Sequence, residues 1–166
     1  MMKNMTTFAD PEQLRTAMRA WTSGVTVVTA AHEGQQHGMT VNSFTSISLD
    51  PPLVVITLED RTRTRQLVDH ARAFGVTILS TEQAEISDRF AGRAAGSENR
   101  MSTVETETLV TGAPFIKGGL AYFDCRVRQS VEAGPNTMFI AEVVAARRIS
   151  EGKPLVYQNR VYRQLV

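Results

Sequence analysis

A run of small polar side chains between residues 40 and 48 could bind the edge of a flat organic group. Its hydroxyl and amide members are Thr40, Asn42, Ser43, Thr45, Ser46 and Ser48. Such side chains offer hydrogen-bond donors and acceptors with little bulk. They suit a polar heterocycle, whose carbonyl and N–H groups need partners once they are buried. By composition alone, an exposed strand rich in threonine and serine explains the same run equally well.

Three arginines at alternate positions form a second candidate site. They are Arg61, Arg63 and Arg65. Thr64, which lies between two of them, is a candidate N-cap for a helix that starts here. Guanidinium groups, free backbone N–H groups and the helix dipole together favour a bound phosphate. The alternative is an exposed basic turn balanced by Glu59 and Asp60.

The usual motifs of nucleophilic, acid–base and metal chemistry are missing from the sequence. Neither of the common glycine-rich phosphate loops occurs. His32-Glu33 with His37 resembles the zinc motif H-E-x-x-H, but Gln36 stands in the second ligand position, so we expect a solvated turn. The single cysteine, Cys125, excludes an internal disulfide and fits a small buried hydrophobe. If the chain is an enzyme, we expect a cofactor to supply the reactivity, with no catalytic side chain and no metal.

The N-terminal part of the chain predicts a helix. Asp10 can cap it, and the proline that follows suits the first helical position. Leu14, Met18 and Trp21 then fall on one face at helical spacing. Gly24 is a suitable stop for this helix.

The rest of the chain predicts mostly short strands. From residue 25 β-branched residues indicate a strand that ends at the turn Glu33-Gly34, and further strands are expected over 39–44, 47–49, 53–58 and 74–79. Thr64 is expected to cap one short helix, and Ser80 with Gln83 forms a capping box for another. Residues 91–113 are expected to form one long irregular stretch.

A long hairpin is expected near the C-terminus. Apolar Ala121, Phe123, Cys125 and Val127 alternate with Tyr122, Asp124, Arg126 and Arg128, which predicts a half-exposed strand. A turn over 133–136 joins it to a second long strand over 138–146, and two short strands over 155–157 and 161–165 follow. Six to nine strands with two or three short helices predict a mainly β fold, a closed antiparallel barrel with helical decoration.

Length and charge set the outer limits. The 166 residues predict a single domain over 1–166, with residues 1–7 as a disordered tail. A formal net charge of +1 gives no general attraction to nucleic acid or an anionic membrane, so we expect neither as a partner. No signal peptide and no apolar run of membrane-spanning length occur, so the expected location is the cytoplasm.

Two segments together resemble the flavin reductase family. These are residues 24–29 and the run from Gly38 to Leu53, which reads GMTVNSFTSISLDPPL. The family comprises the small NAD(P)H:flavin oxidoreductases that serve two-component flavin monooxygenases. The resemblance continues through Phe90-Ala91-Gly92, residues 123–127 and residues 154–157, and it covers about 8–165.

The resemblance implies an FMN-binding split barrel that forms a homodimer, with FMN or FAD as cofactor near the subunit interface and NADH or NADPH as substrate. The implied flavin contacts are Thr40, Val41, Asn42 and Ser43 at the isoalloxazine ring, Ser46 and Ser48 toward the ribityl chain, Arg63 and Thr64 at the phosphate, and Phe90 and Arg93 in a nearby loop. The implied reaction is hydride transfer from nicotinamide C4 to flavin N5. Reduced flavin then leaves for a partner monooxygenase.

One turn departs from the family pattern. Family members commonly carry Gly-Asp-His or Gly-Thr-His between the two long strands, and that histidine is associated with nicotinamide binding. Here the turn is Gly134-Pro135-Asn136. Asn136 can donate a hydrogen bond but cannot carry a charge near neutral pH. The implied nicotinamide-binding residue is therefore Asn136, and the nucleotide preference stays open.

Three other functions remain as alternatives. A flavoenzyme could retain its flavin and reduce another acceptor, and a flavin-binding protein could lack turnover because Asn136 replaces the histidine. A basic turn on an antiparallel barrel could also belong to an oligonucleotide-binding barrel, although the near-zero net charge argues against it. The sequence does not decide whether the flavin is FMN or FAD.

Overall fold

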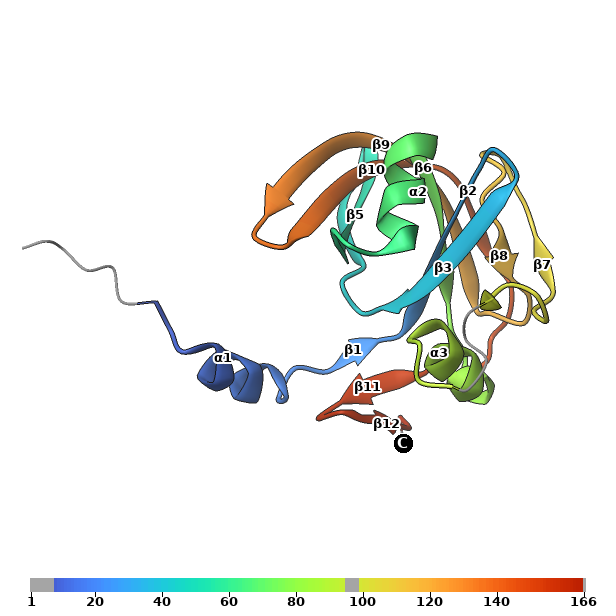
Figure 1. Cartoon of the computed structure of the whole chain (residues 1–166). Coiled ribbons are helices and arrows are strands. Elements are labelled where there is room, and N and C mark those ends of the chain that lie inside the picture. The colour runs from blue at the N-terminus through green and yellow to red at the C-terminus, as the bar shows by residue number, and fades with distance from the viewer. Residues whose placement is uncertain (1–7, 95–98, 166) are drawn as a thin grey trace, which may run out of the picture.

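The computed structural model of the chain describes residues 8–94 and 99–165, so the tail expected over 1–7 lies outside the described residues. The described helices are α1 (Pro11–Met18), α2 (Arg63–Ala71) and α3 (Ala84–Phe90), with the 3-10 helix η1 (Thr81–Gln83) before α3 (Figure 1). The strands are β1 (Ser23–Gly24), β2 (Thr26–His32), β3 (Gln35–Val41), β4 (Thr45–Leu49), β5 (Pro52–Glu59), β6 (Ala73–Ile78), β7 (Thr106–Glu107), β8 (Phe115–Ile116), β9 (Ala121–Ala133), β10 (Asn136–Arg148), β11 (Val156–Gln158) and β12 (Val161–Arg163). The extra strands beyond the expected six to nine include two-residue segments too short to show a periodic pattern.

Seven strands form one curved antiparallel sheet in the order β3-β2-β6-β9-β10-β5-β4. Its two edge strands, β3 and β4, follow each other in the chain, yet among the described residues they share no strand pairing. The mainly β, antiparallel split barrel is therefore confirmed, and the closed barrel is wrong. A second sheet, β1-β11-β12, joins the two ends of the chain, and β7 pairs with β8.

The barrel buries two apolar clusters on the opposite faces of its central strands. In β2, Val28 and Ala30 belong to one cluster, whereas Val27 belongs to the other. Leu67 and Val68 of α2 pack into the first cluster, so this helix covers the interior of the curved sheet. Because β2 is buried on both faces, the strand β3 paired with it is held firmly along its length.

The strand β9 is half-exposed only in its second part, because Arg126 and Arg128 are exposed as predicted whereas Tyr122 and Asp124 are fully buried. The Tyr122 hydroxyl donates to the carbonyl oxygen of Ile116 at 3.0 Å. The Asp124 carboxylate accepts from the backbone N–H groups of Val110 at 2.7 Å and Thr111 at 2.9 Å. The segment 106–116 thus covers this face, so part of the stretch expected to be irregular is structured. Cys125 is buried as expected, and its burial raises the pKa of the thiol.

The N-terminal helix starts where the sequence predicts but ends earlier. Asp10 caps α1 by accepting from the backbone N–H of Glu12 at 3.4 Å. The helix stops at Met18, so Trp21 lies beyond it, and Gly24 belongs to β1 rather than to a helix end. None of its residues is buried, and α1 projects from the body of the molecule (Figure 1).

The predicted cap of α2 is wrong, whereas the predicted capping box at η1 is present. The cap of α2 is Thr62, whose hydroxyl accepts from the backbone N–H of Arg65 at 3.3 Å. Thr64 as the cap is therefore wrong, and its side chain is instead fully buried in the first turn. The capping box is confirmed, because the Gln83 side chain accepts from the backbone N–H of Ser80 at 3.1 Å.

Candidate functional site

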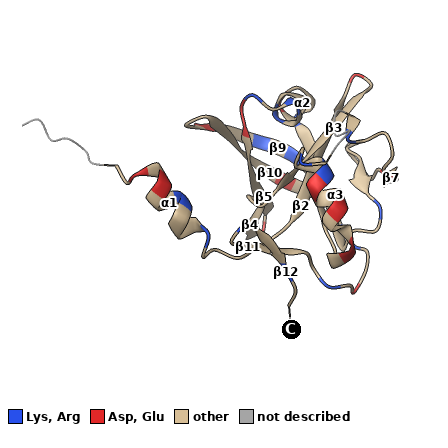
Figure 2. Cartoon of the chain, turned by 60° about the horizontal axis from the view of Figure 1, so that its bottom comes forward, with Lys and Arg blue, Asp and Glu red and all other residues tan. Residues whose placement is uncertain are grey.

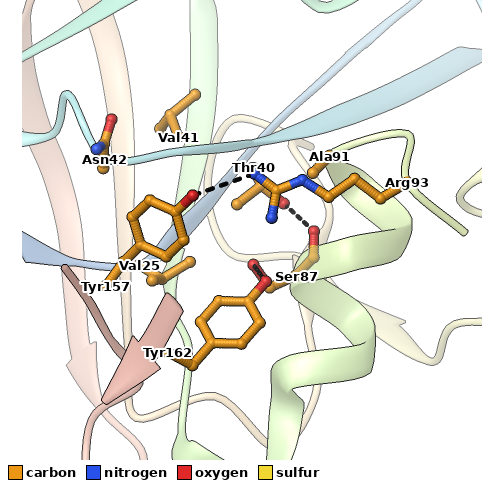
Figure 3. A pocket seen from close by; sticks show the side chains of 9 residues that line it. All are labelled: Val25, Thr40, Val41, Asn42, Ser87, Ala91, Arg93, Tyr157 and Tyr162. Atoms are coloured by element: carbon orange, nitrogen blue, oxygen red, sulfur yellow. Dashed lines mark hydrogen bonds between the residues drawn. The ribbon is translucent and has the colours of Figure 1, made fainter. Parts of the chain in front are cut away.

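Two adjoining cavities lie along β3 and share three lining residues, Thr40, Ala91 and Arg93. The first, which we call the tyrosine cavity, has a volume of about 140 Å³ and is lined by Val25, Thr40, Val41, Asn42, Ser87, Ala91, Arg93, Tyr157 and Tyr162 (Figure 3). The second, the arginine cavity, has a volume of about 540 Å³. Its polar lining comprises His37, Thr40, Glu59, Thr62, Arg63, Thr64, Arg93 and Arg100.

Hydroxyl groups organise the tyrosine cavity. Thr40 donates from its hydroxyl to the carbonyl oxygen of Ser87 at 2.6 Å, which ties β3 to α3. The hydroxyl of Tyr162 lies 2.8 Å from the hydroxyl of Ser87 (Figure 3). It also lies 2.7 Å from the Asp88 carboxylate. Burial raises the pKa of Tyr162, so this phenol stays uncharged at neutral pH. The cavity therefore presents neutral polar groups on an apolar frame.

Arg93 stands at the junction of the two cavities. Its guanidinium donates to the Tyr157 hydroxyl at 3.5 Å and lies 5.8 Å from the centre of that ring (Figure 3). It also pairs with the Asp88 carboxylate at 3.3 Å. The hydrogen bond that Arg93 donates to Tyr157 is the largest of the influences that raise the pKa of Arg93. A fixed cation thus borders both the neutral and the basic part of the groove.

Three guanidinium groups surround the arginine cavity. Arg63 comes from the start of α2, and Arg93 follows α3. Arg100 donates to the carbonyl oxygens of Phe90 at 2.6 Å and Gly38 at 3.3 Å, while its Nε has no partner among the described residues. Burial lowers the pKa of Arg100. This donor set, beside the capped start of α2, fits a phosphate group.

The arginines of the expected phosphate site separate in space. Arg63 alone of the three lines the arginine cavity. Arg61 pairs with Glu59 at 2.6 Å, and Arg65 donates from Nε to the Thr137 hydroxyl at 3.3 Å. Basic and acidic residues are otherwise interspersed along the chain, so the basic cavity is a local feature (Figure 2).

The other expected flavin contacts occupy different layers around the groove. Phe90 is fully buried beneath it, packed against Gly38, where a Cβ atom would meet the Phe90 ring at 2.9 Å. The Ser43 hydroxyl donates to the Thr57 carbonyl at 2.9 Å and accepts from the Thr57 N–H at 3.0 Å, which fixes the loop after β3. Ser46 and Ser48 lie on the exposed edge strand β4, outside the lining of both cavities.

His37 is a site residue that sequence reasoning missed. Its Nδ1 lies 2.7 Å from the Thr64 hydroxyl. Burial is the main cause that lowers the pKa of His37 to about 4, and the nearby Arg100 and Arg63 charges add to it. The zinc-like spacing drew attention to a turn, but the turn ends at Gly34 and His37 lies on β3. His37 and Thr40 are three residues apart on one strand, so their side chains point to opposite faces, and no local pattern in the sequence could have found His37.

Asn136 is placed near the groove but does not line either cavity. It is the first residue of β10, and it pairs across the sheet with Glu59, which lines the arginine cavity. The backbone N–H of Asp60 donates to the carbonyl of Pro135 at 3.1 Å and holds this turn against the end of β5.

Over residues 8–94 and 99–165, no cluster of three or more His, Cys, Asp or Glu side chains is arranged to hold a metal ion. None of the helices described is both long and apolar enough to cross a membrane.

Comparisons with known proteins show the family of the chain. Residues 18–166 match the flavin reductase like domain family. An NADH-dependent flavin reductase from a Rhodococcus species is 36% identical over 158 residues, which cover 93% of this chain and 86% of the relative. An FMN reductase (NADH) from Agrobacterium fabrum is 37% identical and covers 89% of this chain and 82% of the relative.

Solved structures give the same result. Flavin reductase PheA2 superimposes with a TM-score of 0.87 at 36% identity, over 95% of this chain and 99% of that one. The Streptomyces globisporus NADH:FAD oxidoreductase SgcE6, solved with NAD and FAD fragments, has a TM-score of 0.86 at 31% identity over 97% and 98% of the two chains. The chain therefore belongs to the flavin reductase family.

Proposed function

We propose that this flavin reductase holds its flavin along the two adjoining cavities, with the ring toward the tyrosine cavity and the phosphate in the arginine cavity. The observation that carries the proposal is the change of polarity along one strand, β3, from neutral hydroxyl groups to guanidinium groups. A flavin mononucleotide has the same polarity, a flat uncharged ring and a charged phosphate. At about 140 Å³ the tyrosine cavity is smaller than usual ligand sites, so only part of the ring can enter it.

The proposed ring contacts are Thr40, Val41, Asn42 and Ser43, with Arg93 at the junction and Phe90 supporting the groove from below. At the phosphate we propose Arg63, with Thr64 in the layer beneath. The roles of Ser46 and Ser48 toward the ribityl chain remain predictions, since both lie on the neighbouring edge strand.

The protein's contribution to the reaction is binding, orientation and charge stabilisation. When bound, the flavin supplies a hydride acceptor at N5, and NADH supplies the hydride. The side-chain amide of Asn42 would stabilise the negative charge that develops along the ring edge, since the hydroxyls of Thr40 and Ser43 already donate to carbonyl groups of the protein. The side chains of Tyr157 and Tyr162 limit the access of water to that edge.

The test is anaerobic mixing of the purified chain with FMN or FAD and with NADH or NADPH. We expect the visible absorption of oxidised flavin to bleach in an enzyme-dependent manner, fastest with FMN and NADH. Bleaching no faster than in a protein-free control for all four pairs would contradict the proposal.

Some relatives are the reductase components of monooxygenases. One of them, the reductase component of the 4-hydroxyphenylacetate 3-monooxygenase of Thermus thermophilus, is 34% identical to this chain.

We propose a monooxygenase component as the consumer of the reduced flavin, reached by diffusion. Loss of flavin during gel filtration would support diffusion, whereas retention would support the alternative of a flavoenzyme that reduces another acceptor.

We propose the cytoplasm as the compartment, because a nicotinamide nucleotide is the reductant and the lone Cys125 is a free thiol.

We propose that the chain forms a homodimer in which α1 contacts the second copy. Leu14 and Met18 of α1 are exposed, and so is Trp21 just after it, although large apolar side chains favour burial. Light scattering should give twice the chain mass. Trp21 is the single tryptophan, so its emission should move to longer wavelength on dilution below the dissociation constant. A monomer that binds flavin normally would contradict this proposal.

A further inference from the structure

A histidine–threonine pair lies in the wall of the arginine cavity, where two secondary-structure elements meet. His37 comes from β3 and Thr64 from the first turn of α2, and Nδ1 of the imidazole lies 2.7 Å from the threonine hydroxyl. Thr64 is fully buried, whereas His37 is only partly buried. The imidazole therefore stands between a buried hydroxyl and the cavity.

The direction of this hydrogen bond follows from the burial of Thr64. A buried hydroxyl needs an acceptor for its proton. Among the described residues, Nδ1 of His37 is the hydrogen-bond partner found for the Thr64 hydroxyl. The hydroxyl therefore donates and Nδ1 accepts, which places the proton of a neutral imidazole on Nε2.

We propose that Thr64 is a positioning residue that holds His37 in the Nε2–H tautomer, and that this N–H donates to the phosphate of the bound flavin. The proposal rests on the proposed function for the identity of the ligand. The side chain of Thr64 has no exposed surface, so His37, and not Thr64 itself, makes the contact with the phosphate.

The charges around His37 explain why an uncharged donor is useful there. Arg63, Arg93 and Arg100 face the cavity from three different segments, and Glu59 at the end of β5 is the acidic residue in its lining. A further cation would be repelled by these guanidinium groups, whereas a neutral N–H adds a directed hydrogen bond without that cost. The lowered pKa of His37, about 4, keeps the imidazole neutral at physiological pH.

The tautomer can be measured without flavin, by long-range proton–nitrogen NMR correlation of the imidazole in the nitrogen-15 labelled chain at pH 7. The wild type and Thr64→Ser should both show the Nε2–H tautomer for His37, because both supply a hydroxyl. Thr64→Val, which keeps the shape but removes the hydroxyl, should give mixed tautomers. An Nδ1–H tautomer in the wild type, or an unchanged spectrum in Thr64→Val, would overturn the proposal.

Flavin affinity then tests the phosphate contact, by titration of FMN and of riboflavin, which lacks the phosphate, against flavin fluorescence. His37→Asn keeps a polar atom near the Nδ1 position for Thr64 but removes the distal donor, and it should weaken FMN binding at least about 10-fold, as expected for a hydrogen bond to a charged group. Riboflavin has no phosphate for residue 37 to contact, so its affinity should change by less than about 2-fold. His37→Gln, whose amide reaches further, should recover part of the FMN affinity.

His70→Asn is the matched control, because this histidine lies in the last turn of α2 and does not line the arginine cavity. It should leave both affinities unchanged. Equal losses for FMN and riboflavin in His37→Asn, or no loss for FMN, would overturn the phosphate contact. If the wild type binds neither flavin, the proposed function fails, while the tautomer result stands by itself.

Discussion

The two cavities along β3 differ in how they are made polar. In the tyrosine cavity, the hydroxyl groups of Thr40 and Tyr162 both form hydrogen bonds with Ser87 of α3. In the arginine cavity, guanidinium groups converge from separate segments, and the imidazole of His37 remains neutral among them. One strand therefore borders a neutral site at its end and a basic site along its length.

The groove therefore recognises the shape of the flavin ring in the tyrosine cavity and the charge of the phosphate in the arginine cavity. Neutral hydrogen bonds favour a heterocycle edge by modest amounts, whereas charge-assisted bonds to a phosphate are about twice as strong. The basic part should therefore set the affinity for FMN, and the neutral part should act on every flavin alike.

The largest expected effect concerns His37 and the pH dependence of folding. Above about pH 6.5 the imidazole is neutral in both states and contributes no pH dependence. Between 6.5 and about 4 the unfolded chain binds a proton that the folded chain does not, so the free energy of unfolding falls as the pH falls. The loss should amount to at most about 3 kcal/mol.

Urea unfolding at pH 7, 6, 5 and 4 measures this loss. His37→Asn should remove that share of the pH dependence, whatever its own stability at pH 7, and His70→Asn should retain it. If the wild type and His37→Asn lose stability in parallel, His37 is not held neutral by the fold.

Arg63→Gln should act on the basic part alone. Removing a charge-assisted hydrogen bond should weaken FMN binding by about 1.5–3 kcal/mol. Riboflavin binding should stay the same, because it offers no phosphate to the cavity. Arg126→Gln is a suitable control, since Arg126 is exposed on β9 and does not line the cavity. A similar loss in both arginine variants would show a general electrostatic effect instead of a site.

Tyr162→Phe should act on the neutral part. The substitution removes the hydroxyl that contacts Ser87 and Asp88, and should lower the free energy of unfolding by about 1 kcal/mol. FMN and riboflavin should lose affinity by the same factor in fluorescence titrations. A loss confined to FMN would reverse the assignment of the two cavities.

The smallest expected effect is at the turn before β10. Asn136 is a neutral donor, and such a bond contributes about 0.5–1.5 kcal/mol, so we expect hydride transfer to persist with weak nicotinamide binding. Asn136→His should lower the KM for NADH and introduce a pH dependence near the ordinary histidine pKa of about 6.5. Reduction kinetics from pH 5.5 to 8 measure both. If neither changes, residue 136 does not face the nicotinamide.

Periodicity and turn chemistry allowed much of the fold to be predicted. The long hairpin β9–β10, the cap at Asp10 and the capping box at Ser80 depend on local signals, and all are present. The burial of Tyr122 and Asp124 could not be predicted, because the segment 106–116 that covers them is distant in sequence and has no periodic pattern.

The candidate site was predicted in part for the same reason. Thr40, Val41 and Asn42 are adjacent in sequence, so their grouping needs no tertiary information. His37 and Arg100 reach the groove only through the packing of β3, α2 and the segment after α3, which no local pattern encodes. Thr64 was predicted as the helix cap, but Thr62 is the cap, and the burial of Thr64 depends on how that helix sits on the sheet.

The most direct test of the groove's two-part assignment is a crystal structure of the chain with FMN. We expect the phosphate within hydrogen-bond distance of Arg63 and of His37 Nε2, with the ring edge along residues 40–42. A phosphate beside Tyr157 and Tyr162, with the ring among the arginines, would contradict it.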